Sequence, residues 1–104
     1  MLVLLLVVAA LLEVGGDAAI RRGLVSPSPA WLVTGVGLLA GYGYLVNANR
    51  TFGFGTVLGL YITVFFVVSQ LLGTAMFGDR PSLSLLVGVA LIVAGGVVIQ
   101  AGMR

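Results

Sequence analysis

The chain has 104 residues, of which 61% are hydrophobic and only 8% are charged. A soluble domain carries about 25% charged residues, so most of this surface must face lipid rather than water. The few basic residues form no run and give a net charge of +2, which excludes a nucleic-acid-binding surface. Cysteine and histidine are absent, which excludes disulfides, thiolate chemistry and histidine metal sites.

Catalysis with a bound cofactor is not expected either. The chain has no lysine and no glycine-rich phosphate loop, so it cannot drive work with ATP by itself. We therefore expect no enzyme activity, no cofactor and no metal, and any energy used must come from an ion gradient.

The first apolar stretch, Leu2–Ile20, is expected to be a retained membrane helix. A signal peptide has basic residues before its apolar core and a small-residue cleavage motif after it. Here no basic residue precedes the core, and Glu13 and Asp17 occupy the region where cleavage would occur. We expect residues 21–23 to end this helix. Residues 24–29, with two prolines, are expected to lie outside any helix.

Three more apolar stretches follow, at Trp31–Ala48, Phe54–Phe77 and Leu83–Ala101. The second is expected to end at Asn49-Arg50-Thr51, and Trp31 is expected to be an interfacial anchor. Each stretch holds about 18 to 24 residues, and a bilayer core of about 30 Å needs about 20 helical residues. Spanning strands would need alternating polarity. The sequence therefore predicts an all-α integral membrane protein, a bundle of four transmembrane helices forming one domain over residues 1–104.

The arginines are nearly balanced between the two predicted sides of the membrane. Loops one and three carry Arg21, Arg22 and Arg80, whereas the other side carries Arg50, Arg104 and the terminal amine. Positive charge on short loops orients membrane helices. This balance permits either orientation, including both in one membrane; the alternative is that a small bias fixes one.

Glu13 is the main candidate for a functional residue, because it lies inside the first apolar stretch. It is about seven residues, or roughly 10 Å, from the predicted end of that helix. A carboxylate facing lipid at the centre of a helix costs about 2.5 kcal/mol or more, so we expect it to face the bundle interior or a water-filled cavity. Low dielectric disfavours its charged form, which suits a proton or cation site. The alternative is a neutral acid that only hydrogen-bonds a neighbouring helix.

Other polar residues are weaker candidates. Asp17 lies one helical turn after Glu13 on the same face; it either joins Glu13 in a polar path or pairs with Arg21 at the interface, and we favour the ion pair. Four further side chains could line a cavity with Glu13, although each could instead be an interfacial anchor or bond its own backbone: Tyr42, Asn47, Thr56 and Tyr61.

The fourth stretch contains an uncharged seam of Gly88, Leu91, Ile92 and Gly95, spaced at i, i+3, i+4 and i+7. Small residues at this spacing let helices approach closely in a membrane. We interpret the seam as a packing surface, either within one chain or between two copies.

These patterns resemble the small multidrug resistance family, the four-helix bacterial exporters of the drug/metabolite transporter superfamily. Residues 10–16, Ala-Leu-Leu-Glu-Val-Gly-Gly, resemble the stretch around that family's membrane glutamate, and Arg21 matches its basic residue at the helix end. Phe77–Arg80 resembles its F-G-[E/Q]-x turn, and Gly88–Gly95 resembles its G-x-x-L-I-x-A-G dimerisation seam.

The resemblance implies an antiparallel homodimer, or a heterodimer with a paralogue, spanning the inner (plasma) membrane several times. It also implies proton-coupled export, in which Glu13 binds protons and a cationic or hydrophobic small molecule in turn. The family's Tyr and Trp, which would fall near Thr56 and Gly59, are missing, and Asp17 is an additional acid. Export of aromatic polycations or of guanidinium is therefore not implied.

Two other functions remain open. The first is a flippase or carrier for a lipid-linked or hydrophobic solute, which a chamber lined by Thr, Asn and Gly would favour. The second is a non-transporting structural subunit of a larger membrane complex.

Overall fold

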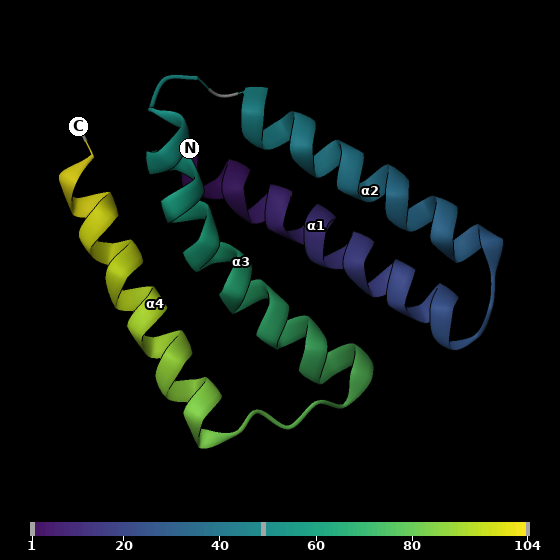
Figure 1. The fold of residues 1–104 in the computed structure, drawn as a ribbon. Coiled ribbons are helices and arrows are strands. Elements are labelled where there is room, and N and C mark those ends of the chain that lie inside the picture. The colour runs from purple at the N-terminus through teal and green to yellow at the C-terminus, as the bar shows by residue number, and fades with distance from the viewer. Residues whose placement is uncertain (1, 49, 104) are drawn as a thin grey trace. The chain divides into compact units, whose positions relative to one another are not determined.

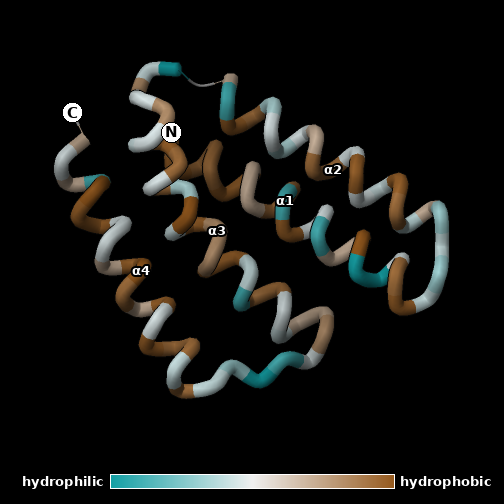
Figure 2. The backbone as a smooth tube through the Cα atoms, viewed as in Figure 1, coloured by the Kyte–Doolittle hydropathy of each residue, from teal (hydrophilic) through white to brown (hydrophobic). Residues whose placement is uncertain are grey.

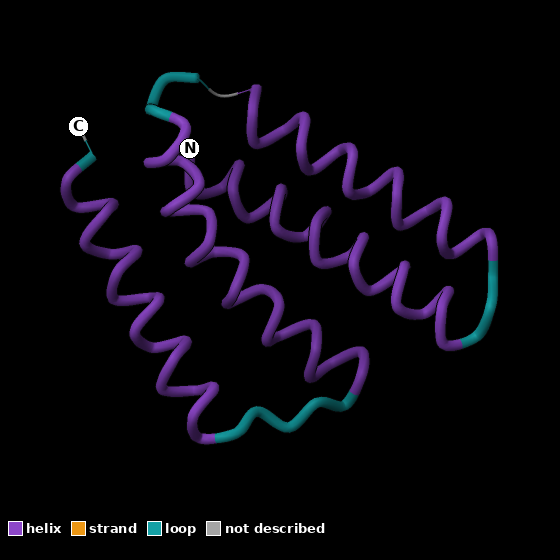
Figure 3. Tube along the Cα trace, viewed as in Figure 1, coloured by secondary structure: helices purple, strands orange, loops and turns teal. Residues whose placement is uncertain are grey.

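Four α-helices account for the regular structure of the chain in a computed structural model, which describes residues 2–48 and 50–103 (Figure 1, Figure 3). The helices are α1 (Leu2–Val25), α2 (Pro29–Ala48), α3 (Phe54–Phe77) and α4 (Leu83–Gly102). All four are long and apolar enough to cross a membrane. The predicted fold class, an all-α protein with four membrane-spanning helices, is confirmed.

The chain divides into two compact units, Met1–Asn49 and Arg50–Arg104. Each unit is a hairpin of two helices, α1 with α2 and α3 with α4. That the two hairpins form one bundle stays a prediction. Asn49, the terminal amine and Arg104, which the sequence analysis placed at loop two and at the chain ends, lie outside the described residues.

The first helix is longer than predicted, because it continues through Val25 rather than ending at Ile20. Arginine side chains can reach the membrane surface from within a helix, so Arg21 and Arg22 do not stop it. The helix ends two residues before Pro27, since a proline disfavours helical geometry at the residue before it. Pro29 then opens α2, where the missing N–H of a first helical residue is not needed.

Glycines bring α1 and α2 close together. A Cβ atom built on Gly16 would lie 3.0 Å from the carbonyl oxygen of Gly35, and one on Gly23 would lie 2.9 Å from Leu32 Cγ. All three glycines are buried. Lipid removes the hydrophobic force between helices, so close van der Waals contact through small residues holds such a hairpin together.

One small residue and one hydrogen bond bring α3 and α4 together. Thr63 Oγ1 donates to the carbonyl oxygen of Ile92 at 3.2 Å. A Cβ on Gly96 would lie 2.6 Å from Thr63 Cγ2, so Gly96 gives Thr63 the room to reach α4. The contact between these helices is therefore set by Thr63, Ile92 and Gly96.

The ends of α3 and α4 have recognisable caps. Gly78 closes α3 in the left-handed region with φ 66°, which glycine adopts without strain. Ser82 opens α4, where its side-chain oxygen accepts a hydrogen bond from the Leu85 N–H at 3.1 Å. The connection between the two helices is hydrophilic, whereas the helices are mainly apolar (Figure 2).

Candidate proton and substrate site

Glu13 lies at the middle of α1, eleven residues after Leu2 and twelve before Val25. At about 1.5 Å per residue, each end of the helix is roughly 17 Å away. The prediction placed Glu13 nearer one surface because it ended the helix at Ile20. The longer helix puts this half-buried carboxylate at mid-span, where a charge costs most.

Tyr42 of α2 lies at the same level of the first hairpin as Glu13. The antiparallel register brings Gly41 opposite Leu12, since a Cβ on Gly41 would lie 3.7 Å from Leu12 Cδ1. The Tyr42 phenol is close enough to interact electrostatically with both Glu13 and Asp17. The first hairpin thus gathers Glu13, Asp17 and Tyr42, three of the predicted site residues.

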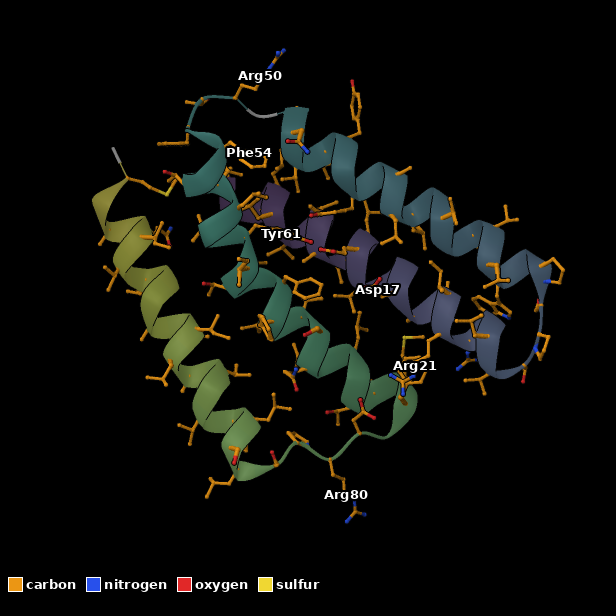
Figure 4. All side chains as sticks on the ribbon, in the orientation of Figure 1. Asp17, Arg21, Arg50, Phe54, Tyr61 and Arg80 are labelled. Carbon is orange, nitrogen blue, oxygen red and sulfur yellow. The ribbon has the colours of Figure 1, made fainter. Side chains whose placement is uncertain are left out.

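Asp17 is exposed on the surface of α1, unlike the half-buried Glu13. It lies eight residues before Val25, or about 12 Å along the helix. Asp17 and Arg21 both project from the second half of α1 (Figure 4). The ion pair between them stays a prediction. An exposed acid at this depth needs water, a cation or another protein surface around it, because lipid cannot solvate it.

The remaining predicted residues are not all part of this group. Asn47 Nδ2 donates to the Gly43 carbonyl oxygen at 2.8 Å, which is the local backbone bond that the sequence analysis gave as the alternative. Thr56 is exposed and Tyr61 is buried, and both belong to the second hairpin. Their part in a shared cavity stays a prediction.

Sequence reasoning missed an aromatic cluster on α3. The Tyr61 and Phe65 rings have their centroids 6.1 Å apart, and Phe65 and Phe66 meet edge to face at 5.8 Å. Aromatic pairs prefer such tilted arrangements. The one-turn spacing of Tyr61 and Phe65 is the signal that could have revealed the cluster.

Gly59, where the resembling family has an aromatic residue, faces α4. A Cβ at this position would already lie 3.1 Å from Ile99 Cδ1. A side chain at this position would require Ile99 to shift, and the glycine lets α3 and α4 lie close together here.

The predicted seam on α4 is only partly used inside its hairpin. Nothing lies within 4 Å of a Cβ built on Gly88 or on Gly95, and Leu91 is 69% exposed. Ile92 is half-buried and bonds Thr63 through its carbonyl oxygen. The contact with α3 runs instead through Gly96, next to the seam.

Among residues 2–48 and 50–103, no group of three or more His, Cys, Asp or Glu side chains could hold a metal ion. The chemistry that the described site offers is therefore that of carboxylates and a phenol: proton transfer, hydrogen bonding and the binding of a cation.

Several proteins are similar to this chain over nearly its whole length. A UPF0060 membrane protein of Frankia casuarinae is 37% identical over 102 residues, which cover 97% of this chain and 93% of the relative. A UPF0060 membrane protein of Mycobacterium marinum is 35% identical over 101 residues, covering 95% and 92%. One of Clavibacter sepedonicus is 33% identical over 103 residues, covering 98% and 92%.

No family model matches the chain, and no solved structure matches it. The relatives match from one end of the chain to the other, and all three are named as membrane proteins. The four spanning helices agree with that name. The chain therefore belongs to the UPF0060 membrane protein family.

Proposed function

We propose that this protein is a proton-coupled exporter of small cationic or hydrophobic molecules, of the small multidrug resistance type, in the inner (plasma) membrane. The observation that carries the proposal is the place of Glu13, a half-buried carboxylate at the middle of a membrane-spanning helix. Ionisable groups at such a depth are costly, and membrane proteins place them on substrate and proton pathways.

The neighbours of Glu13 support this role. The Tyr42 phenol lies near it on the facing helix and can donate a hydrogen bond to a carboxylate. Asp17, one turn away, interacts electrostatically with the same phenol. Protons and a cationic substrate then compete for one negative charge. Loading of either on one side of the membrane promotes release of the other, which couples their movements.

A dimer of two oppositely oriented copies fits this scheme. The near balance of arginines between the two predicted sides permits opposite insertion. On α4, nothing lies within 4 Å of a Cβ built on Gly88 or Gly95, and Leu91 is exposed, so this side of α4 is not used within its own hairpin. We propose that a second copy covers this seam and that each copy contributes Glu13 to a shared chamber. A paralogue in place of the second copy would fill the same role.

Exchange in liposomes tests the role of Glu13. The purified protein is reconstituted, a proton gradient is imposed, and uptake of labelled organic cations is compared for the original chain and Glu13→Gln. We expect Glu13→Gln to abolish gradient-driven uptake, because an amide neither releases a proton nor attracts a cation. Persistence of exchange in this variant at the original rate would exclude the role.

Two further acids calibrate this experiment. Asp79→Asn makes the same chemical change in the connection after α3, outside the spanning helices, and is expected to leave uptake unchanged. Asp17→Asn is expected to slow uptake by less than about tenfold, because Asp17 is exposed whereas Glu13 is half-buried; a tenfold change corresponds to about 1.4 kcal/mol. Equal losses in Asp17→Asn and Glu13→Gln would show that the two acids act as one site.

A second candidate function is a carrier for a lipid-linked or hydrophobic solute. Gly59 packs against Ile99 instead of presenting an aromatic ring, and Thr56 is exposed. A surface without stacking rings there suits an aliphatic solute better than a flat aromatic cation. Transfer of a fluorescent lipid between leaflets that persists in Glu13→Gln would favour this function over proton-coupled export.

A further inference from the structure

The connected ends of α1 and α2 form a positively charged tip that carries exposed apolar side chains. The tip comprises residues 21–31 and contains Arg21 and Arg22, and the sequence has no acid between Asp17 and Asp79. Leu24 is 68% exposed and Val25 is 76% exposed. Apolar side chains beside arginines and a tryptophan, at the end of a helix long enough to span a membrane, are typical of the membrane interface. This composition suits a tip at the level of the lipid headgroups.

Arg22 is held in place by an aromatic ring. Its guanidinium carbon lies 5.6 Å from the centroid of the Trp31 ring, within the range of a cation–π interaction. This contact joins the last turn of α1 to the first turn of α2. The cation–π contact draws on the charge of the guanidinium group, whose five N–H donors suit phosphate oxygens.

A phosphate is the group that these donors fit. Guanidinium groups bind phosphate oxygens through two parallel hydrogen bonds, and tryptophan itself prefers the headgroup level of the bilayer. A zwitterionic lipid brings its own cation and leaves the charge of the tip uncompensated, whereas an anionic lipid neutralises it. From this geometry we infer that Arg22, positioned over the Trp31 ring, binds the headgroup phosphate of an anionic phospholipid.

Trp31 makes the site directly measurable, because it is the only tryptophan in the chain. The full-length protein is placed in vesicles that contain either brominated phosphatidylglycerol or brominated phosphatidylcholine at equal mole fraction, and quenching of its emission is measured. We expect phosphatidylglycerol to associate with the site about fivefold more strongly, the gain typical of one basic residue near an anionic surface. Equal quenching by the two lipids would overturn the inference.

Two variants and a control assign the preference to Arg22. Arg22→Gln is expected to lower the preference for phosphatidylglycerol about fivefold. Arg22→Lys keeps the charge but not the paired N–H donors, and it is expected to retain only part of the preference. Arg50→Gln removes one arginine from the other hairpin and is expected to change nothing. Full preference in Arg22→Gln, or its loss in Arg50→Gln, would contradict the assignment.

A final competition experiment distinguishes a bound lipid phosphate from a soluble anion. Inorganic phosphate is added in excess to the phosphatidylglycerol vesicles, with chloride at matched ionic strength as the reference. Unchanged quenching relative to chloride supports a lipid site. Specific reversal by phosphate would show that a free anion occupies Arg22 and would overturn the lipid assignment.

Discussion

Gly16 and Gly35 face each other across the α1–α2 hairpin so closely that a Cβ atom on Gly35 would lie 2.8 Å from the carbonyl oxygen of Gly16. The same Cβ would also lie 2.5 Å from Ile20 Cγ1 and 3.1 Å from the Ile20 backbone nitrogen. Because two of these three atoms belong to the backbone, a side chain at position 35 can be accommodated only if the helices separate.

Gly35→Ala is therefore expected to destabilise the first hairpin by about 1–3 kcal/mol, the usual cost of overfilling a tight contact. Gly37→Ala is the matched control, since nothing lies within 4 Å of its added carbon, and it should be neutral or slightly stabilising. Unfolding in mixed detergent, followed by circular dichroism, measures both. Equal stabilities of the two variants would mean that α1 and α2 do not approach as described.

Adjacent glycines on α4 give a second comparison. Gly96→Ala would bring a carbon to within 2.6 Å of Thr63 Cγ2, whereas the same change at Gly95 meets open space. In detergent-solubilised monomer, unfolding followed by circular dichroism is expected to show Gly96→Ala less stable by about 1–3 kcal/mol and Gly95→Ala nearly unchanged. Adding Thr63→Ala to Gly96→Ala should recover part of the loss, although it also removes the Thr63–Ile92 hydrogen bond. A larger loss for Gly95→Ala than for Gly96→Ala would place α3 on the other side of α4.

Single cysteines can report how two copies meet along α4, because the chain has none of its own. Leu91 lies near the middle of the helix, and Val98 lies seven residues on and is 71% exposed. In an antiparallel pair the middle of one helix meets the middle of the other. Leu91→Cys is therefore expected to form a disulfide dimer in membranes, and Val98→Cys is not.

The control for that experiment is Val33→Cys, which is 71% exposed on α2 and is not a seam residue. Crosslinking of both Leu91→Cys and Val98→Cys would indicate parallel copies. Crosslinking of Val33→Cys as efficiently as Leu91→Cys would indicate random collision, and the seam would then not be a dimer contact.

The helices were predictable because an unbroken apolar run long enough to cross a bilayer has no other stable conformation in lipid. The end of α1 was not predictable in this way, because the apolar stretch ends at Arg21 and Arg22 although the helix continues through them. Their long side chains reach the surface while the backbone stays helical. The first residue that stops the helix is Pro27, through its effect on the residue before it.

The site was predictable in part. Glu13 was predictable because a carboxylate within an apolar stretch is rare and costly, and Asp17 follows it by one helical turn. The proximity of Tyr42 depends on the register of α2 against α1, which the Gly16–Gly35 contact sets and which one sequence does not reveal. The face of α4 that meets α3 was equally hidden, because no charged residue marks a side of this helix. Gly96 and the carbonyl oxygen of Ile92 carry that contact, whereas Gly88 and Gly95 have open space around them.

Only residues 26–28 join α1 to α2, and this short connection limits how the two helices can cross the membrane. Two spanning helices tied by so few residues must cross the bilayer in opposite directions. Arg21 and Arg22, next to the turn, therefore lie on the same side of the membrane as the turn, whichever orientation the chain takes.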